Sequence, residues 1–327
     1  MPKVSIVVPV YGVEKYIRRC AESLFKQTLD DLEFIFVNDC TKDKSMEVLQ
    51  SVIDEYHPSN VKIINHQQNK GLPQARKTGI AAATGDYIVN CDSDDWVDSE
   101  YCEKLFNKAC SSNADMVVCS FWFADDTGAD EIKWGDNSVY GSPRLAFRYF
   151  LAEKLQISIW TKLVRRKIAQ KEDILTPLQY SAEDWALVTQ WMYYCKKIEY
   201  VDCPLYYYNV GNQTQSRHLT PENCIKNCCQ KRDNVNMVCK WLGEKERLSS
   251  YSQEIVSIKA QTKQMLFPVM DNPECRKLWR RIYREVNIPI LWNKYLPRKY
   301  KTVHFKYLFG RLYPFAVSVL HKFKRFD

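Results

Sequence analysis

Three carboxylates lie within four residues at Asp92-Ser93-Asp94-Asp95, directly after the strand-like run 87–91. Negative charges this close together destabilise a fold unless a positive group lies beside them, and a divalent cation is the simplest such partner. Oxygen ligands favour Mg²⁺ or Mn²⁺ over zinc. One aspartate could instead cap the following helix, the role that we prefer for Asp98. Because one cap needs one carboxylate, we favour a metal site for Asp92 and Asp94.

Three further polar positions lie where a predicted strand ends or a predicted helix begins. Asp39 follows the run 32–37 and either closes an ordinary turn or accepts hydrogen bonds from a nucleobase or ribose. Arg76 either points at phosphates or is a solvated helix charge, and from the residue alone we favour the solvated charge. Glu183-Asp184 suits the positive end of a helix dipole, and the residues alone favour this over a catalytic role.

Several common catalytic and nucleotide-binding motifs are missing from the sequence. No two glycines are separated by one residue, so there is no Gly-rich dinucleotide turn. The chain also has no P-loop G-K-[ST], no H-E-x-x-H and no G-x-S-x-G. An α/β sheet without these motifs must bind a nucleotide in another way or not at all.

Short apolar runs alternate with helical spacing over the first 120 residues. We expect strands at 4–10, 32–37, 61–64, 87–91 and 116–119, and helices at 13–27, 44–56, 74–83 and 99–110. This alternation predicts right-handed βαβ units and a parallel sheet, whose ligands bind beyond the carboxyl ends of the strands. The polar residues that follow the strands are therefore the first candidates for function.

The rest of the chain is less regular. Residues 121–182 hold polar turns and a helix near 143–152, and they precede a helix at 183–195 and strands at 197–210. A helix start signal at Thr220-Pro221-Glu222 opens a helical region that runs to about residue 270.

Length and composition bound the class of protein. The 327 residues suit one large α/β domain with an appendage, and 46% apolar with 26% charged residues excludes a disordered chain. No window of about 18 apolar residues predicts a transmembrane helix. The 13 cysteines are odd in number and form no C-x-x-C pair, which predicts a reducing cytoplasm rather than a disulfide framework or zinc site.

Seven segments resemble, in order, the motifs of family 2 inverting glycosyltransferases with the GT-A fold. They are Val4-Ser5-Ile6-Val7-Val8-Pro9-Val10-Tyr11, Val37-Asn38-Asp39-Cys40-Thr41-Lys42-Asp43, Asn69-Lys70-Gly71-Leu72-Pro73-Gln74-Ala75-Arg76, Asp92-Ser93-Asp94-Asp95-Trp96, Trp160-Thr161-Lys162-Leu163-Val164-Arg165-Arg166, Glu183-Asp184-Trp185 and Pro204-Leu205-Tyr206-Tyr207-Tyr208. The resemblance covers roughly residues 3–217. It implies a Rossmann-like mixed α/β sheet flanked by helices over 1–217, with a helical, basic C-terminal extension over 218–327.

The resemblance implies that the donor is a nucleotide-diphosphate sugar, with a UDP-sugar favoured. Pro9, Tyr11 and Asp39 would line the uracil or other base, and Asp92 would contact the ribose or the sugar. Arg76 would join them as a donor-binding residue. The family usually has D-D-G-S at the segment that reads Asn38-Asp39-Cys40-Thr41 in this chain. We interpret Asn38 as a tolerated change because Asp39 is retained.

The resemblance also implies the catalytic groups. Asp94 would hold Mn²⁺ or Mg²⁺ at the diphosphate, and Asp184 would be the general base of a single inverting displacement. Trp185 would either desolvate Asp184 and raise its pKa or stack on a sugar ring. His218 would be a metal ligand, a phosphate contact or a surface histidine. The family often has A-R-N where this chain has Lys77, which can alter sugar or phosphate contacts.

The predicted activity is sugar transfer to a glycan or lipid-linked acceptor in cell-surface polysaccharide synthesis. A membrane-embedded polysaccharide synthase is disfavoured because no transmembrane helix is predicted. A non-catalytic nucleotide-sugar-binding or scaffold protein is the alternative from another class, and the presence of both Asp94 and Asp184 argues against it.

The basic charge is concentrated in the last 56 residues. Residues 272–327 hold 14 Lys and Arg against 3 acidic residues, a net of +11 in a chain whose total is +8. The apolar residues from Leu312 to Phe323 form one helical stripe. We expect this tail to bind an anionic membrane surface, peripheral on the inner face of the cell membrane, with a helix packed on the catalytic domain as the alternative. Nucleic acid is not expected as a partner, since no nucleic-acid module is recognisable.

Overall fold

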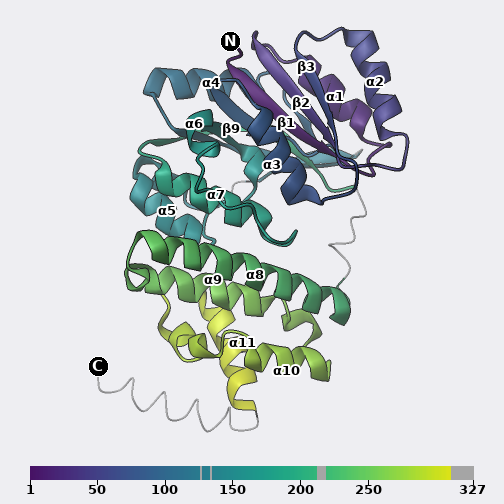
Figure 1. Ribbon diagram of the computed structural model, residues 1–327. Coiled ribbons are helices and arrows are strands. Elements are labelled where there is room, and N and C mark those ends of the chain that lie inside the picture. The colour runs from purple at the N-terminus through teal and green to yellow at the C-terminus, as the bar shows by residue number, and fades with distance from the viewer. Residues whose placement is uncertain (126, 133–134, 212–218, 311–327) are drawn as a thin grey trace. The chain divides into compact units, whose positions relative to one another are not determined.

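The structure is a computed structural model that describes residues 1–125, 127–132, 135–211 and 219–310 (Figure 1). Contacts within the chain divide it into two compact units, Met1–Arg217 and His218–Asp327. The first unit contains a β-sheet with flanking helices, and the described part of the second is helical. The predicted tail stripe from Leu312 to Phe323 lies outside the described residues.

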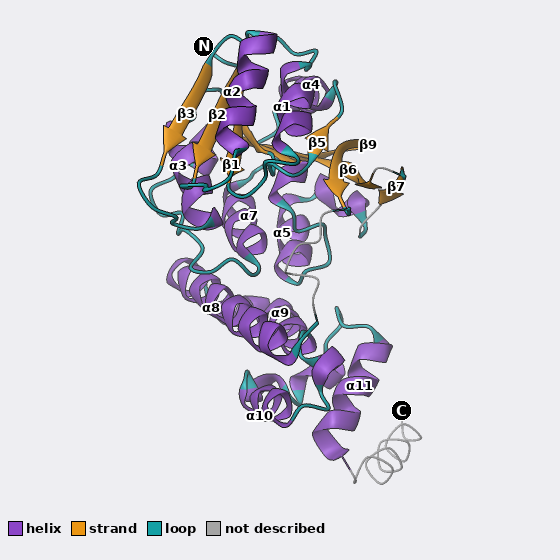
Figure 2. Ribbon diagram, turned by 90° about the vertical axis from the view of Figure 1, so that its right-hand side faces the viewer, coloured by secondary structure: helices purple, strands orange, loops and turns teal. Residues whose placement is uncertain are grey.

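The strands of the described first unit form one nine-stranded sheet (Figure 2). They are β1 (Val4–Val10), β2 (Leu32–Asn38), β3 (Val61–Asn65), β4 (Tyr87–Asn90), β5 (Trp96–Val97), β6 (Met116–Asp125), β7 (Gly128–Ile132), β8 (Lys162–Arg165) and β9 (Ile198–Asn209). Along the sheet their order is β3-β2-β1-β4-β8-β6-β9-β5, and β7 pairs with β6. Strands β1 and β2 are fully buried apart from Asn38, as their continuous apolar runs require.

The sheet is mixed, as the family resemblance implies. Strands β1 to β4 are parallel, whereas β8 runs antiparallel to both β4 and β6. The five strands predicted from strand–helix alternation, β1 to β4 and β6, all run in the same direction, so the predicted parallel arrangement is confirmed for them, and the antiparallel β8 lies between β4 and β6. Strand β6 is also longer than the predicted 116–119, since it continues to Asp125 and pairs there with β7.

The helices of the first unit cover both faces of the parallel part of the sheet. Their bounds are α1 (Ile17–Phe25), α2 (Ser45–Tyr56), α3 (Leu72–Ala82), α4 (Tyr101–Ser112), α5 (Pro143–Leu151), α6 (Arg166–Ala169) and α7 (Glu183–Tyr194). Phe25 on α1 contacts two rings of β2: its ring centroid lies 5.1 Å from that of Phe34 and 6.1 Å from that of Phe36. Helix α3 lies against Val37, whose side chain points to the opposite face because it is one position further along the strand.

Helix α3 approaches the sheet closely at Gly79. A Cβ atom at this position would lie 2.3 Å from Val7 Cγ1 and 3.2 Å from Val37 Cγ2. Only a residue without a side chain fits there. This contact fixes the depth of α3, and with it the position of Arg76 one turn earlier on the same helix.

The described part of the second unit consists of α8 (Pro221–Lys245), α9 (Ser252–Gln264), α10 (Pro273–Arg281), α11 (Arg298–Phe309) and short 3₁₀ turns. Its interior includes Trp241, Trp279 and the fully buried Lys263. The Lys263 ammonium donates hydrogen bonds to the carbonyl oxygens of Trp279 and Ile282. None of the helices among the described residues has the length and apolar character needed to span a bilayer.

Candidate active site

The carboxyl ends of β1, β2 and β4 meet at one edge of the sheet, and the predicted site residues follow them. Pro9 is buried near the end of β1, whereas Tyr11, just beyond it, is 50% exposed. Asp39 follows β2 and is only 3% exposed. This edge is where ligands bind in open α/β sheets.

The Asp39 carboxylate organises the loop that leads into α3. Its Oδ1 accepts a hydrogen bond from the Lys70 amide at 2.8 Å and lies 2.7 Å from His66 Nδ1. Its Oδ2 accepts a hydrogen bond from the Gly71 amide at 2.7 Å. Gly71 has a φ of +83°, which an L side chain rarely adopts, so glycine suits this turn. Asp39 therefore has a structural function in the free protein.

The acidic turn after β4 is held in place by β9. The Asp95 side chain is 1% exposed. It accepts hydrogen bonds from the Tyr206 hydroxyl at 2.7 Å and the Asn209 amide at 2.8 Å. The same Tyr206 oxygen accepts a hydrogen bond from the Asp92 amide at 3.0 Å, and Asn209 Nδ2 donates to the Asp94 carbonyl at 3.0 Å. Strand β9 thus fixes the main chain of the turn.

The carboxylates of this turn differ in burial. Burial raises the pKa of Asp95 well above its ordinary value, and the charges of Asp94 and Asp92 raise it further. The Asp92 side chain is 24% exposed, and Asp94 is half-buried. Beneath the turn, the free thiols of Cys20 and Cys91 lie 3.9 Å apart. Asp92 and Asp94 are the carboxylates of the turn that a ligand can reach.

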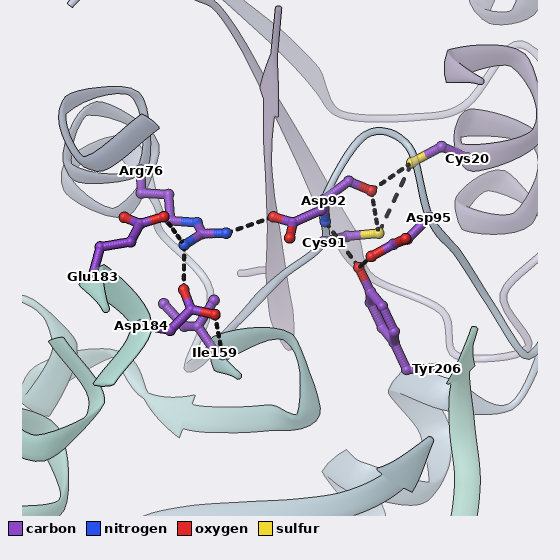
Figure 3. Close-up of polar contacts among 9 residues, drawn as sticks. All are labelled: Cys20, Arg76, Cys91, Asp92, Asp95, Ile159, Glu183, Asp184 and Tyr206. Atoms are coloured by element: carbon purple, nitrogen blue, oxygen red, sulfur yellow. Dashed lines mark hydrogen bonds and ion pairs between the residues drawn. The ribbon is translucent and has the colours of Figure 1, made fainter. Parts of the chain in front are cut away.

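Arg76 connects the acidic turn with the start of α7 (Figure 3). Its NH2 group donates to Asp92 Oδ1 at 2.5 Å, and its NH1 group donates to Glu183 Oε1 at 2.6 Å and to Asp184 Oδ1. The Arg76 side chain is 2% exposed, so the predicted solvated helix charge is wrong. A buried cation between three carboxylates is the compensation that a buried charge requires.

This network shifts the pKa values of Arg76, Glu183 and Asp184. Burial alone would lower the pKa of Arg76, but the charges of Glu183, Asp184 and Asp92 raise it well above its ordinary value. Burial raises the pKa of Glu183 and of Asp184, and Arg76 opposes both shifts. Groups with perturbed pKa values that gather at one edge of a sheet are typical of a catalytic centre.

Asp184 combines a buried environment with a partly open carboxylate. Its side chain is 21% exposed, and its Oδ2 accepts a hydrogen bond from the Ile159 amide at 3.2 Å. The neighbouring Trp185 is fully buried, so the predicted stacking of this ring on a sugar is wrong. Such a carboxylate, with a raised pKa and one face toward solvent, can accept a proton from a hydroxyl group.

A divalent cation fits this site only with ligands from a bound molecule. Among the described residues, no group of three or more His, Cys, Asp or Glu side chains is arranged to hold a metal ion. Asp94 supplies one half-buried carboxylate on a turn fixed by Asn209. Mg²⁺ is commonly held by one or two carboxylates together with substrate phosphates and water, and this donor set matches that chemistry.

The structure thus joins Arg76, Asp92 and Asp184 in one network and places Asp39 in a second network at the same edge. His218 lies outside the described residues. Reasoning from the sequence missed the contributions of His66, Asn209 and the Ile159 amide. The sequence pointed to Tyr206 only through the family motif Pro204-Leu205-Tyr206-Tyr207-Tyr208. The motif did not show which of the three tyrosine hydroxyls contacts the acidic turn after β4.

The mixed sheet and the acidic turn after β4 are the features that the GT-A fold of glycosyltransferases predicts. Residues 5–171, half of the chain, match the family "Glycosyl transferase family 2". The chain therefore belongs to glycosyl transferase family 2.

Known relatives and solved structures agree with this assignment. The chain is 34% identical over 216 residues to EpsH, a candidate glycosyltransferase of Bacillus subtilis (strain 168), covering 64% of this chain and 61% of EpsH. It is 29% identical to glycosyltransferase GlyA of Streptococcus pneumoniae serotype 4, over 67% of this chain and 32% of GlyA. The chain thus spans less than two thirds of the length of EpsH and less than one third of the length of GlyA.

The fold resembles residues 1–349 of TarS from S. aureus, with a TM-score of 0.66 at 18% identity, covering 94% of this chain and 92% of the TarS chain. This likeness confirms the predicted GT-A fold.

Proposed function

We propose that this protein is a metal-dependent, inverting glycosyltransferase that moves a sugar from a nucleotide-diphosphate donor to a glycan or lipid-linked acceptor. The observation that carries the proposal is the Asp92–Arg76–Asp184 network, in which one buried guanidinium joins the donor edge of the sheet to a partly exposed carboxylate. A site for donor phosphates and a base for an acceptor hydroxyl are thereby held in one network.

A UDP-sugar is the proposed donor. A structure of TarS 1–349 with UDP-GlcNAc, which has a TM-score of 0.60 to this chain at 19% identity, supports a uridine nucleotide. Tyr11 is 50% exposed beside the end of β1 and would cover the base. Asp39 would shape the base pocket from the loop that it holds at Lys70 and Gly71. Asp92 would contact the ribose or the sugar.

Asp94 is the proposed ligand for Mn²⁺ or Mg²⁺, with His218 as a further candidate. A related fold, the mannosyltransferase PcManGT of Pyrobaculum calidifontis, was solved with GDP-Man and Mn²⁺; its TM-score to this chain is 0.54 at 13% identity. A divalent cation bound there would neutralise the negative charge of the leaving diphosphate. Arg76, already buried beside Asp92, is placed to add a fixed positive charge on the same side.

Asp184 is the proposed general base. Its Oδ1 is paired with the Arg76 guanidinium, whereas the described partner of Oδ2 is the neutral Ile159 amide. Oδ2 is therefore the more basic oxygen, and the acceptor proton would move to it as the hydroxyl attacks the anomeric carbon. One base on the face opposite the leaving group suffices for a single displacement, which inverts the anomeric configuration.

The segment that precedes Asp184 is the proposed acceptor side. Leu175, Leu178 and Tyr180 are 40%, 61% and 55% exposed, an unusual concentration of large apolar side chains. Although much of the Tyr180 side chain is exposed, desolvation raises the pKa of its hydroxyl to about 12, and the charges of Asp92 and Glu183 add to the rise. The ring of Tyr180 is suited to stack on the face of an acceptor sugar, and the two leucines are suited to contact an attached lipid.

The second unit offers a surface for an anionic membrane. A groove of about 350 Å³ on α10 is lined by Arg276, Lys277, Arg280, Arg281 and Pro273. In the same unit, Trp292 is 66% exposed. Clustered cations with an exposed tryptophan are typical of binding at a lipid surface. We therefore propose a cytoplasmic protein that binds peripherally to the inner face of the membrane during polysaccharide synthesis.

The test is a screen of nucleotide-sugars with the purified chain. We expect one UDP-sugar to raise the melting temperature only with Mn²⁺ or Mg²⁺ present, and to be hydrolysed slowly when no acceptor is added. Binding without any turnover, in the presence of lipid-linked and glycan acceptors, would favour a nucleotide-sugar-binding protein. No binding of any nucleotide-sugar would contradict the proposal.

A further inference from the structure

Lys162, at the start of β8, is a fully buried lysine whose described hydrogen-bond acceptors are neutral oxygens, and its ammonium also lies 5.6 Å from the centroid of the Phe150 ring. Its Nζ donates to the carbonyl of Gln156 at 2.8 Å, the carbonyl of Ser158 at 2.6 Å and Thr161 Oγ1 at 2.9 Å. All three protons of the ammonium are thereby used. Burying a charge without an ion pair costs free energy, so this arrangement calls for a compensating role.

The three oxygens belong to the segment that contacts Asp184. Residues 156–161 lead into β8, and within them the Ile159 amide donates to Asp184 Oδ2 at 3.2 Å. Lys162 binds this segment on both sides of Ile159, at Ser158 and Thr161. The Trp160 carbonyl accepts a further hydrogen bond from the Tyr101 hydroxyl at 2.7 Å. Removing the ammonium would release the amide that orients Asp184.

Lys162 also acts on Asp184 through its charge. Burial lowers the pKa of Lys162 to about 7, while the charge of Asp184 opposes this shift. Cys119 is a buried thiol whose own pKa burial raises to about 12, so it remains neutral near pH 7.

Several other charged groups also face Asp184. Burial raises the pKa of Asp184, Arg76 lowers it, Asp92 raises it and Lys162 lowers it. Glu183 also pairs with Arg76, and the charge of Asp184 contributes to the raised pKa of Tyr180. Arg76 is thus the permanent cation that favours the ionised base, and Lys162 adds to it below about pH 7, where its ammonium is protonated.

We propose that Lys162 is a positioning residue for Asp184: it fastens residues 156–161 so that the Ile159 amide meets Oδ2, and its protonated ammonium places a positive charge behind the carboxylate. Glycosyl transfer needs Asp184 ionised before the acceptor arrives, and Lys162 favours that state without contacting either substrate. The inference rests on the proposed role of Asp184 as the general base.

The test is Lys162→Met, which keeps the length of the side chain and removes its charge. We expect kcat to fall about 10–100-fold while the affinity for the donor is unchanged, since a displaced base can reduce the rate by this amount. Without the positive charge the pKa of Asp184 rises, so the acidic limb of the kcat/KM profile moves to higher pH. Lys263→Met is the matched control, because Lys263 is equally buried and donates to two carbonyls in the second unit.

A second measurement does not require turnover. In protein labelled with ¹³C at the aspartate carboxyl carbons, an NMR titration gives the pKa of Asp184, with Asp184→Asn to assign its signal. We expect this pKa to be higher in Lys162→Met than in the wild type and unchanged in Lys263→Met. Thr161→Val, which retains the charge but removes one oxygen acceptor, provides a milder variant if Lys162→Met does not fold.

Two results would overturn the inference: an unshifted Asp184 pKa in Lys162→Met, or an equal shift in the Lys263→Met control. If Lys162→Met does not fold, Thr161→Val takes its place, and turnover by Thr161→Val at the wild-type rate would also overturn the inference. The wild type could instead transfer no sugar while the Asp184 pKa still shifts in Lys162→Met. In that case the proposed function is wrong, but the link between Lys162 and Asp184 is supported.

Discussion

The acidic turn after β4 and the acidic start of α7 are built alike. Each pairs a buried carboxylate with a partly exposed one: Asp95 is 1% exposed beside Asp92, and Glu183 is 5% exposed beside Asp184. The buried member of each pair holds protein groups, namely Tyr206 and Asn209 or Arg76. The exposed member shares Arg76 but keeps one side open to a ligand.

The difference between the two clusters lies in how the buried member is neutralised. Burial raises the pKa of both, but Asp95 accepts hydrogen bonds from neutral donors, whereas Glu183 is paired with a buried cation that opposes the rise. Adjacent acidic residues in a motif are thus not equivalent. The partly exposed carboxylates should determine rate and binding, and the buried ones should determine stability.

The largest effect is expected for Asp184→Asn. This nearly isosteric change removes the base, and loss of a general base typically costs about 10²–10⁴-fold in rate. Donor affinity and melting temperature should stay close to those of the wild type. Rapid-quench single-turnover assays at saturating donor measure the rate, and a wild-type rate would show that Asp184 is not the base.

Asp94→Ala should abolish the effect of the metal on donor binding. A bound cation contributes several kcal/mol at a phosphate site, so we expect UDP affinity in Mn²⁺ to fall roughly 100-fold. Isothermal titration calorimetry with and without Mn²⁺ measures this, and Asp98→Ala is the control on the same segment. If the wild type and Asp94→Ala bind UDP with equal affinity, both with and without Mn²⁺, Asp94 is not part of a metal site.

Asp95→Ala should affect stability instead of metal binding. The change leaves the Tyr206 hydroxyl and the Asn209 amide without their acceptor, and each buried unpaired group costs about 1–3 kcal/mol. We expect the free energy of unfolding in urea to fall by about 2–4 kcal/mol. Asp94→Ala should change it by no more than about 0.5 kcal/mol. Similar losses in both variants would remove the distinction between buried and exposed carboxylates.

Glu33 tests the same distinction outside the site. Burial alone would raise its pKa, but hydrogen bonds from Lys62, Ser5 and Thr84 lower it from 4.5 to about 2. Because the folded pKa is below the unfolded one, the contribution of Glu33 to stability is present above pH 4.5 and is lost as the pH falls toward 2.

Glu33→Gln should therefore lower the free energy of unfolding at pH 7 by about 2 kcal/mol, allowing for solvent screening. It should also flatten the pH dependence of stability in acid. Urea unfolding series at several pH values measure both effects. An unchanged slope below pH 4.5 would show that Glu33 is not a stabilising carboxylate.

Much of the fold could be predicted from the sequence, because strands β1 to β4 and their helices obey simple periodicity. The position of Asp39 and of the acidic turn followed from this order of elements. The burial of Arg76 did not, because its partners Glu183 and Asp184 lie 107 and 108 residues away along the chain. The role of Lys162 could not be predicted either, because its partners are two backbone carbonyls and a hydroxyl, which are not marked by any charged residue in the sequence.

The central claim is that Asp184 directs an inverting transfer from a sugar nucleotide, and the stereochemistry of donor hydrolysis tests it most directly. The wild-type chain is incubated with the UDP-α-sugar selected by the screen, Mn²⁺ and no acceptor, and ¹H NMR follows the first-formed sugar before it mutarotates. The account predicts the β-anomer from the wild type and little product from Asp184→Asn. The α-anomer, or β-anomer formed equally fast by the variant, would contradict it.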